Sequence, residues 1–263
     1  MSDLERGVSE NSPEVQVCLV FPHTTGNGPE NMARDETMLD LVASDSSVAA
    51  LRTYGWTEPT LSLGYFQSLA EAMVNPRWNG VPLVRRPTGG GALWHDQELT
   101  YALALPGAHP LSRRPRDLYR LVHSAIAGLL NTLGVQAHRR GETKPASGRT
   151  RPFLCFTDED AEDIVIDEHK VVGSAQRRRS GVVLQHGSLL LGASSRTPEL
   201  LGVRELARWP ADPEDWASAW FNATIPQVLG LSARAQSWGP SLQERALERE
   251  VSVYRNPGWT ERR

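Results

Sequence analysis

Cys155 and Lys170 are the two side chains whose types best fit nucleophilic chemistry in this chain. Lysine occupies only two of the 28 basic positions, 144 and 170, and the only other cysteine is Cys18. A thiolate is a competent nucleophile when a neighbouring cation stabilises it, and a lysine ammonium is such a cation. Cys18 lies inside the apolar stretch VQVCLVFP, so we interpret it as a core residue. If Cys155 and Lys170 meet in the fold, they form a candidate nucleophile with its activating charge.

Each of these residues also has a plainer interpretation. Cys155 has the apolar neighbours Phe153, Leu154 and Phe156, a setting that is typical of a small buried hydrophobic residue. Lys170 starts a strand pattern, where a lone lysine is typically a solvated surface residue. His186 lies in the middle of an apolar strand pattern, where a histidine is ordinarily a hydrogen-bonded part of the core. The spacing of these residues leaves both interpretations open.

A second motif, RRPTGGGALWH, places three adjacent glycines between two arginines and a histidine at 85–95. Glycine loses much conformational freedom on folding, so three in a row predict an unusual turn or a close approach to the backbone. A Walker A phosphate loop is excluded because the chain has no Gly-Lys pair, and the dinucleotide fingerprint GxGxxG fails at Trp94. The motif favours a substrate groove with a floor of bare backbone. Its two arginines either contact an anion there or are solvated.

The elements that must position these residues follow an α/β pattern. Strand and helix patterns are interspersed without strict βαβ alternation, which predicts a mixed sheet flanked by helices. A polar hairpin turn at 167–169 puts Lys170 at the start of the returning strand. The sequence predicts strands near 15–22, on either side of the turn at 58–59, and near 98–106, 162–166, 170–176 and 181–192; it predicts helices near 29–44 and 117–134, and mostly helix after 198.

Length and composition limit the function further. The 263 residues are 40% hydrophobic and 22% charged with a formal net charge of -3, which argues against a general nucleic-acid-binding protein. No apolar run approaches the length of a membrane span. The polar, acidic residues 1–14 predict a disordered tail rather than a signal peptide, followed by one domain over 15–263. Two distant cysteines and no signal peptide suggest a reducing, cytoplasmic location.

Two long motifs together carry a resemblance to a known family. RRPTGGGALWHDQELTYAL, followed by KVVGSAQRRRSGVVLQHGSLLL, resembles the signature of the biotin/lipoate A/B protein ligase family, closest to its lipoate-protein ligase A and LipM-type octanoyltransferase branch. NMARDETML, RTYGWTEPTLSLGYFQ and the spacing from Tyr254 to Trp259 support it, so the resemblance covers roughly 15–259. It implies a single catalytic domain of the biotin/lipoyl ligase type, a mixed β-sheet flanked by helices, related to class II aminoacyl-tRNA synthetases.

The resemblance also implies a site. Cys155 and Lys170 would be the catalytic residues, with Lys170 near the acyl carbonyl, and the glycine loop would line a groove for a medium-chain acyl group. No metal ligand is expected. His95 and His186 are candidate proton acceptors, although no spacing argument assigns either one. The substrate-binding residues implied are Arg85, Arg86, Thr88, Gly89, Gly90, Gly91, His95, Gly173, Ser174, Ala175, Gln176 and His186.

Three functions remain open within this family. An octanoyltransferase would move octanoate from acyl carrier protein, through a cysteine thioester and without a cofactor, to a lysine of a lipoyl domain such as glycine cleavage H protein or a 2-oxoacid dehydrogenase E2 subunit. Three features favour the octanoyltransferase: the residues ELTY at 98–101, Cys155-Phe156 upstream of the hairpin, and the expectation that the chain leaves no room for an accessory domain. Against it, the residues TDEDAEDIVI at 157–166 depart from the Pro/Ser-rich stretch that usually follows the cysteine in this branch. The alternatives are a lipoate-protein ligase that uses ATP and Mg²⁺ through lipoyl-AMP, and an inactive protein that binds lipoyl domains or acyl carriers. No nucleic-acid or membrane partner is expected.

Overall fold

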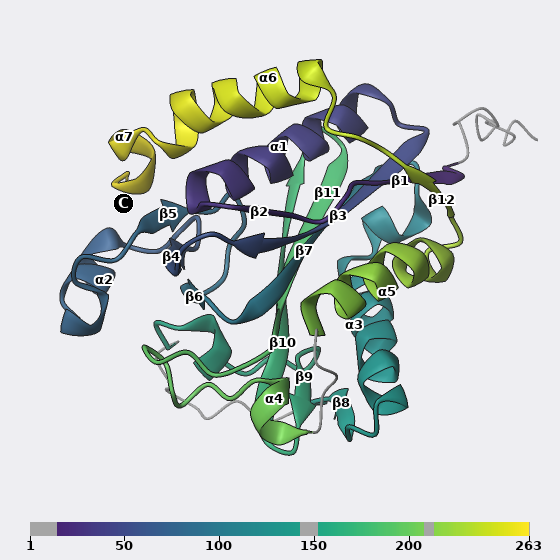
Figure 1. Ribbon diagram of the computed structural model, residues 1–263. Helices are drawn as coiled ribbons and strands as arrows, with labels where there is room; N and C mark the ends of the chain where they lie inside the picture. Colours follow the sequence, from purple (N-terminus) through teal and green to yellow (C-terminus); the bar gives the residue numbers. More distant parts are fainter. Residues whose placement is uncertain (1–14, 143–151, 208–212, 263) are drawn as a thin grey trace, which may run out of the picture.

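The computed structural model of the chain describes residues 15–142, 152–207 and 213–262. The predicted tail at 1–14 therefore lies outside the described residues, and the division into a tail and one domain stays a prediction. The described residues form a mixed α/β structure in which helices flank a large sheet (Figure 1). The predicted fold class is confirmed.

The larger sheet has nine strands within the described residues, in the order β12-β1-β3-β7-β11-β10-β9-β8, with β2 paired to β3. Pairing is parallel among β12, β1, β3 and β2 and antiparallel across the rest. The strands are β1 Val17–Val20, β2 Thr24–Gly26, β3 Val48–Trp56, β7 Glu98–Pro106, β8 Ala137–Arg139, β9 Ile164–Ile166, β10 His169–Arg179, β11 Val182–Leu190 and β12 Ser232–Ala235.

A smaller sheet presents the glycine loop. Its order is β5-β4-β6, with β4 parallel to β5 and antiparallel to β6. The loop connects β5 to β6 and so leaves this sheet and returns to it. The strands are β4 Thr60–Leu63, β5 Leu83–Arg85 and β6 Leu93–His95.

Helices cover both faces of the larger sheet. In Figure 1, α1 and α6 lie over one face, and α3 and α5 over the other. The four longest helices of the described residues are α1 Gly28–Ser44, α3 Pro115–Thr132, α5 Pro213–Val228 and α6 Pro240–Arg249. The short elements are α2 Leu69–Met73, α4 Val203–Leu206, α7 Pro257–Thr260, the 3₁₀ turns η1 Pro76–Trp78, η2 Pro110–Arg113 and η3 Cys155–Thr157, and a π-helical turn, η4, at Glu250–Tyr254.

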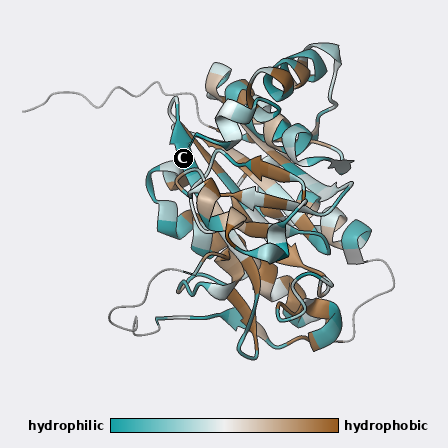
Figure 2. Ribbon diagram, turned by 90° about the vertical axis from the view of Figure 1, so that its left-hand side faces the viewer, coloured by the Kyte–Doolittle hydropathy of each residue, from teal (hydrophilic) through white to brown (hydrophobic). Residues whose placement is uncertain are grey.

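The central strand β7 shows how the sequence builds these layers. Successive side chains of a strand point to opposite faces. Its bulky residues Leu99, Tyr101, Leu103 and Leu105 join the core under α3 and α5, whereas its small residues Ala102 and Ala104 face α1. Figure 2 shows the hydrophobic colouring concentrated in the strands between the helices. The small side chains allow α1 to lie close to the sheet, which brings the polar residues of α1 near the pocket described below.

Most predicted elements are confirmed within one to three residues. The helix predicted at 29–44 begins at Gly28, because Asn27 and Glu30 form a capping box around its first turn. The strands on either side of the turn at 58–59 exist but belong to different sheets. The hairpin turn at 167–169 is confirmed, with Asp167 at φ 48°.

The prediction of mostly helix after 198 missed one strand. β12 has the sequence SARA, and all four residues are exposed. It has no apolar alternation from which a strand can be recognised; its extended backbone follows from parallel pairing with β1 at the edge of the sheet.

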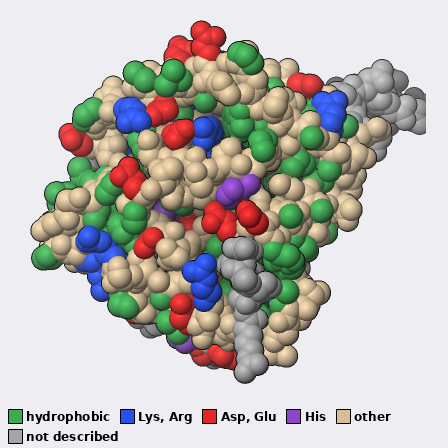
Figure 3. Space-filling view, viewed as in Figure 1, with side chains coloured by type: hydrophobic (Ala, Val, Ile, Leu, Met, Phe, Trp, Pro, Cys, Tyr) green, Lys and Arg blue, Asp and Glu red, His purple; other side chains and the backbone are tan. Residues whose placement is uncertain are grey.

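The surface has no single dominant charge on the face seen in Figure 3, where acidic and basic side chains are interspersed with hydrophobic ones. Among the helices of the described residues, none combines the length and apolar character that crossing a membrane requires.

Candidate active site

The structure brings Cys155 and Lys170 together. The Lys170 Nζ lies 3.9 Å from the Cys155 Sγ and donates a hydrogen bond to the Cys155 carbonyl oxygen at 2.9 Å. Cys155 begins the 3₁₀ turn η3 and is partly exposed, whereas Lys170 is only 7% exposed. The surface interpretation of Lys170 is therefore wrong. A buried ammonium beside a partly accessible sulfur is the arrangement that stabilises a thiolate.

Asp163 completes this group, and sequence reasoning missed it. Its Oδ2 lies 2.8 Å from the Lys170 Nζ, and both side chains are buried. Burial disfavours the charged form of Lys170, but Cys155 and Asp163 outweigh burial and raise the pKa of Lys170 above its usual value. Burial also raises the pKa of Asp163, against the opposing effect of the ammonium. Because the ion pair is close and the backbone N–H of Asp160 also binds Asp163 Oδ2, at 2.8 Å, we regard both groups as charged at neutral pH.

A local irregularity of β10 makes room for Lys170. The pairing with β9 shifts register between Lys170 and Val172, which marks a β-bulge. A side chain at Gly173 would place its Cβ 2.8 Å from the Lys170 Cε, closer than real contacts allow. Gly173 thus leaves room for the observed path of the lysine side chain.

The glycine loop fixes the backbone of Cys155. The Ala92 N–H donates to the Phe153 carbonyl, and the Cys155 N–H donates to the Ala92 carbonyl, both at 2.8 Å. A Cβ at Gly91 would lie 2.9 Å from the Cys155 nitrogen, and Gly90 has φ +91°, a conformation that disfavours other residues. Two of the three glycines are therefore explained by a close approach and by a left-handed backbone.

The two arginines of the loop motif are buried, so the solvated interpretation of them is wrong. Arg85 donates to the carbonyls of Gly64, Gln67 and Thr260. Arg86 donates to the carbonyls of Ser62, at 3.1 Å, and of the loop residues 89 and 91, at 2.9 and 2.5 Å. Burial lowers the pKa of Arg86 to about 10, so it stays a cation at neutral pH. Its buried Nε has no hydrogen-bond partner among the described residues.

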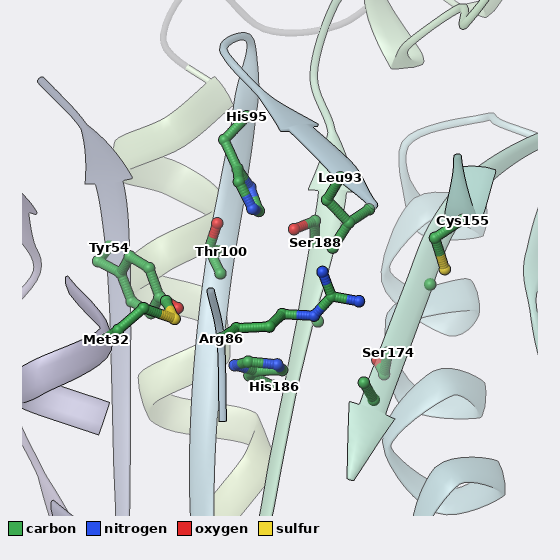
Figure 4. Close-up of a pocket in the computed structure, with 13 residues that line it drawn as sticks. Met32, Tyr54, Arg86, Leu93, His95, Thr100, Cys155, Ser174, His186 and Ser188 are labelled. Carbon is green, nitrogen blue, oxygen red and sulfur yellow. The ribbon is translucent and has the colours of Figure 1, made fainter. Parts of the chain in front are cut away.

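A pocket lies between Cys155 and the α1 face of the sheet (Figure 4). In Figure 4 the Arg86 guanidinium points toward the side of the pocket where Cys155 lies. Of the residues predicted for the site, those that line this pocket are Arg86, His95, Cys155, Gly173, Ser174, Ala175 and His186. The predicted residues that are not among its lining are Arg85, Thr88, Gly89, Gly90, Gly91, Lys170 and Gln176.

The two histidines of the pocket wall are held by buried carboxylates. His95 Nδ1 lies 2.6 Å from Glu98 Oε1, and its Nε2 lies 2.7 Å from Ser62 Oγ. His186 Nδ1 lies 3.3 Å from Asp35 Oδ2, and its Nε2 contacts the Thr88 hydroxyl. Burial lowers the pKa of His186, despite the opposing effect of Asp35, so its imidazole is neutral at pH 7. Both rings are hydrogen-bonded parts of the core at the pocket wall.

A hydrogen-bonded chain on the α3 side of β10 was also missed by sequence reasoning. His123 Nδ1 contacts the Glu162 carbonyl, so Nδ1 carries the proton and Nε2 accepts from the Ser174 hydroxyl at 2.7 Å. The Tyr101 hydroxyl then donates to the Ser174 oxygen at 2.7 Å. Burial lowers the pKa of His123 to about 4, which keeps the ring neutral. The only sequence signal was a histidine on the apolar face of a strongly amphipathic helix.

This chain of hydrogen bonds fixes the edge of β10 next to Cys155. β9 pairs with β10 only as far as Val172, so from Gly173 onward that edge has no strand partner among the described residues. The Tyr119 hydroxyl donates to the Ser174 carbonyl at 3.3 Å from that side. Since the N–H and C=O of one strand residue point the same way, the Ser174 N–H also points to the open edge. It is a candidate donor to a carbonyl oxygen bound there.

No group of three or more histidine, cysteine, aspartate or glutamate side chains placed to hold a metal ion occurs among the residues that the structure describes.

Comparison with known proteins places the chain in a family. The lipoyl protein ligase A/B catalytic domain matches residues 27–201. The chain is 38% identical over 181 residues to octanoyltransferase LipM of Macrococcus caseolyticus, a match that covers 65% of each protein. It is 37% identical over 169 residues to octanoyltransferase LipM of Bacillus subtilis, covering 61% of this chain and 60% of that protein. The chain thus matches less than two thirds of the length of these relatives.

Solved structures show the same fold. A Thermoplasma acidophilum protein with bound lipoic acid superposes with a TM-score of 0.71 at 22% identity, covering 95% of this chain and all of that one. A lipoate-protein ligase A with bound ATP superposes with a TM-score of 0.70 at 24% identity, covering 94% and 98% of the two chains.

Proposed function

The chain belongs to the lipoyl protein ligase A/B catalytic-domain family, and we propose that it is an octanoyltransferase that works through a thioester on Cys155. It would move an octanoyl group from acyl carrier protein to a lysine of a lipoyl domain, in the cytoplasm, where both of its cysteines remain free thiols. The observation that carries this proposal is the Cys155 Sγ at the pocket, 3.9 Å from the buried ammonium of Lys170. Identity of 35–38% to several LipM octanoyltransferases supports it.

In the first step the Cys155 thiolate attacks the carbonyl carbon of the donor thioester. A bond forms between Sγ and that carbon, the bond to the donor sulfur breaks, and the donor leaves as a thiolate that takes up a proton. The octanoyl group is activated throughout, so no ATP is needed for this step. Lys170, held by Asp163, stabilises the Cys155 thiolate before attack.

Negative charge develops on the carbonyl oxygen in this step and needs donors that are already in place. The Ser174 N–H at the open edge of β10 and the unpaired Nε–H of Arg86 are the donors that we propose. Arg86 Nε has no hydrogen-bond partner among the described residues, so it breaks no existing side-chain bond to act. The Ser174 N–H lies on an edge of β10 that has no strand partner among those residues.

In the second step the lysine amine of the acceptor attacks the octanoyl thioester. An amide bond forms, the bond from carbon to Sγ breaks, and Cys155 returns as a thiolate beside Lys170. The two protons that an ammonium must lose pass to solvent. His95 and His186 are both occupied by hydrogen-bond partners, so we do not assign either one to this proton transfer.

Intact-mass spectrometry with octanoyl-acyl carrier protein, without ATP, tests the proposal. The wild-type protein should gain one octanoyl group that hydroxylamine removes. Cys155→Ser should gain none or lose most of the rate, whereas the matched control Cys18→Ser should react normally, since Cys18 is fully buried and its pKa is raised to about 12 by burial. Modification of a lipoyl domain by Cys155→Ala at full rate, and only with free lipoate and ATP, would establish the ligase instead. Binding of a lipoyl domain without any adduct would establish an inactive protein.

A further inference from the structure

An arginine cluster lies at the far end of β10 from Cys155. We propose that Arg113, Arg114, Arg116 and Arg178 form the docking surface for the acyl-donor protein, an acidic carrier that presents its thioester on a long, phosphodiester-linked arm. This inference rests on the proposed octanoyltransferase function and names the face of the chain that the donor uses.

Two contacts bring these arginines together from distant parts of the sequence. The Arg178 guanidinium of β10 donates to the Ser112 carbonyl, directly before Arg113. The Gln176 side chain donates to the Pro115 carbonyl at 3.1 Å. The end of β10 therefore lies against the turn η2 and the first residues of α3. Arg113, Arg114, Arg116 and Arg178 are all exposed there.

The positive charge of this cluster is not neutralised. None of its four members takes part in an ion pair with another described residue, although the chain as a whole carries a net charge of -3. The neighbouring Arg179, by contrast, is paired with Glu36 and Asp40 of α1. The nearest acidic residue in α3, Asp117, lies 4.0 Å from Arg120 instead. Unpaired charge of one sign, gathered from two elements, is what attracts and orients a partner of opposite sign.

The distance to Cys155 favours a donor with a long arm. Gly173 lies beside the Lys170 Nζ, and hence beside Cys155, while Arg178 is five residues further along the same strand. At the rise of a strand this separates Arg178 from the thiol by about 17 Å along β10. A lysine side chain is much shorter than that, so an acceptor that docked on these arginines would not reach Cys155. A flexible arm that ends in a thioester spans such a gap, and its phosphodiester adds a negative charge next to the arginines.

Between the cluster and the pocket, residues 174–177 of β10 are half-buried rather than fully covered. From Gly173 onward the edge of β10 has no strand partner among the described residues. Arg116 and Tyr119 lie one turn apart on the same face of α3, and Tyr119 contacts the Ser174 backbone at that edge. The edge of β10 thus runs from the arginines to the pocket lining at Ser174, and an arm laid along it would bring its end to Cys155.

Charge reversal tests the inference. We compare wild-type protein, Arg114→Glu/Arg116→Glu and the control Arg234→Glu/Arg245→Glu, which changes net charge equally. Arg234 and Arg245 are exposed and without described ion pairs, and they lie on β12 and α6, which contribute no residue to the cluster. Two acyl donors are used: octanoyl-acyl carrier protein, and octanoyl-N-acetylcysteamine, a small thioester without protein or phosphate. The rate of octanoyl addition to Cys155 is measured by intact-mass spectrometry from 25 to 500 mM salt.

The Arg114→Glu/Arg116→Glu protein should lose at least about tenfold in second-order acylation rate with the carrier at low salt, and the loss should shrink as salt rises. Its reaction with the small thioester should match wild type, which also shows that it is folded. Equal rates with the carrier for both double variants would overturn the inference, as would a loss confined to transfer onto a lipoyl domain. If the wild-type protein reacts with neither thioester, the proposed function itself fails.

Discussion

Replacing Lys170 by methionine separates its two roles, in stability and in chemistry. Methionine keeps the length and apolar stem of lysine but removes the ammonium. The variant leaves Asp163 as a buried carboxylate without its ion-pair partner, which lies at 2.8 Å with both side chains no more than 6% exposed. It also removes the cation 3.9 Å from the Cys155 sulfur. Both consequences are measurable and have different sizes.

The cost to stability follows from burial. An exposed ion pair contributes about 0–1 kcal/mol, but removal of one partner of a buried pair typically costs about 3–5 kcal/mol, because the other charge stays desolvated. We expect Lys170→Met to lower the free energy of unfolding by about that amount. Lys170→Met/Asp163→Asn should recover most of it, since asparagine is neutral and its oxygen can still accept from the Asp160 N–H.

The stabilisation of the Cys155 thiolate by Lys170 is not restored in the double variant. Two unit charges 4 Å apart interact by about 4 kcal/mol at an effective dielectric constant of 20, and Asp163 offsets part of this at the sulfur. We expect alkylation of Cys155 by iodoacetamide at pH 7 to slow roughly 10- to 100-fold in both variants. Urea unfolding followed by tryptophan fluorescence gives the stability, and mass spectrometry of the alkylated peptide gives the rate. A Lys170→Met protein as stable as wild type would refute the buried-pair argument. An unchanged alkylation rate would remove Lys170 from thiolate stabilisation.

Three further predictions concern the groups around this pair. Gly91→Ala should destabilise the protein by about 1–3 kcal/mol, because its Cβ would lie 2.9 Å from the Cys155 nitrogen, whereas Gly89→Ala, with no atom nearer than 3.9 Å, should be nearly neutral in the same urea titration. Arg86→Lys should destabilise by about 2 kcal/mol or more in thermal unfolding, since lysine cannot satisfy carbonyls on two sides at once. Burial lowers the pKa of His123 from 6.5 to about 4, so the ring is neutral in both the folded and the unfolded state above pH 6.5. As the pH falls from 6.5 to 4, the unfolded chain binds the proton first, which favours unfolding. The wild-type protein should therefore lose about 3 kcal/mol of its free energy of unfolding over this range, and His123→Asn should not.

The fold could be predicted from sequence where apolar periodicity and turn residues agree. The long strands, the helix after Pro115 and the hairpin before Lys170 all have such patterns, and all are present. β12 could not be found in this way, because its strand state depends on a partner, β1, more than two hundred residues away in the sequence.

The site could be predicted only in part, for a physical reason. Cys155 and Lys170 are recognisable because their residue types suit nucleophilic chemistry. Asp163 and His123 also have residue types that suit catalysis. Their importance, however, comes from burial and from contacts across the sheet, which sequence spacing does not show. The loop arginines are buried and bind backbone carbonyls, so the interpretation that they are solvated is wrong. Their sequence does not show this, because a guanidinium that binds carbonyls has the same sequence signature as one that binds an anion.

The three glycines of the motif therefore affect the site through Cys155 rather than by contact with the pocket, whose lining includes Arg86 and His95 of the same motif. Arg86 binds two carbonyls of the loop, and Ala92 of the motif holds the backbone on both sides of Leu154, directly before Cys155. Gly91 leaves room for the backbone of Cys155. We expect a substitution in the loop to displace the Cys155 thiol even if it touches no substrate. Loss of acyl transfer in a loop variant thus does not identify a substrate contact. The alkylation rate of Cys155 distinguishes the two causes: it changes when the thiol is displaced, and it stays at the wild-type value when only a substrate contact is lost.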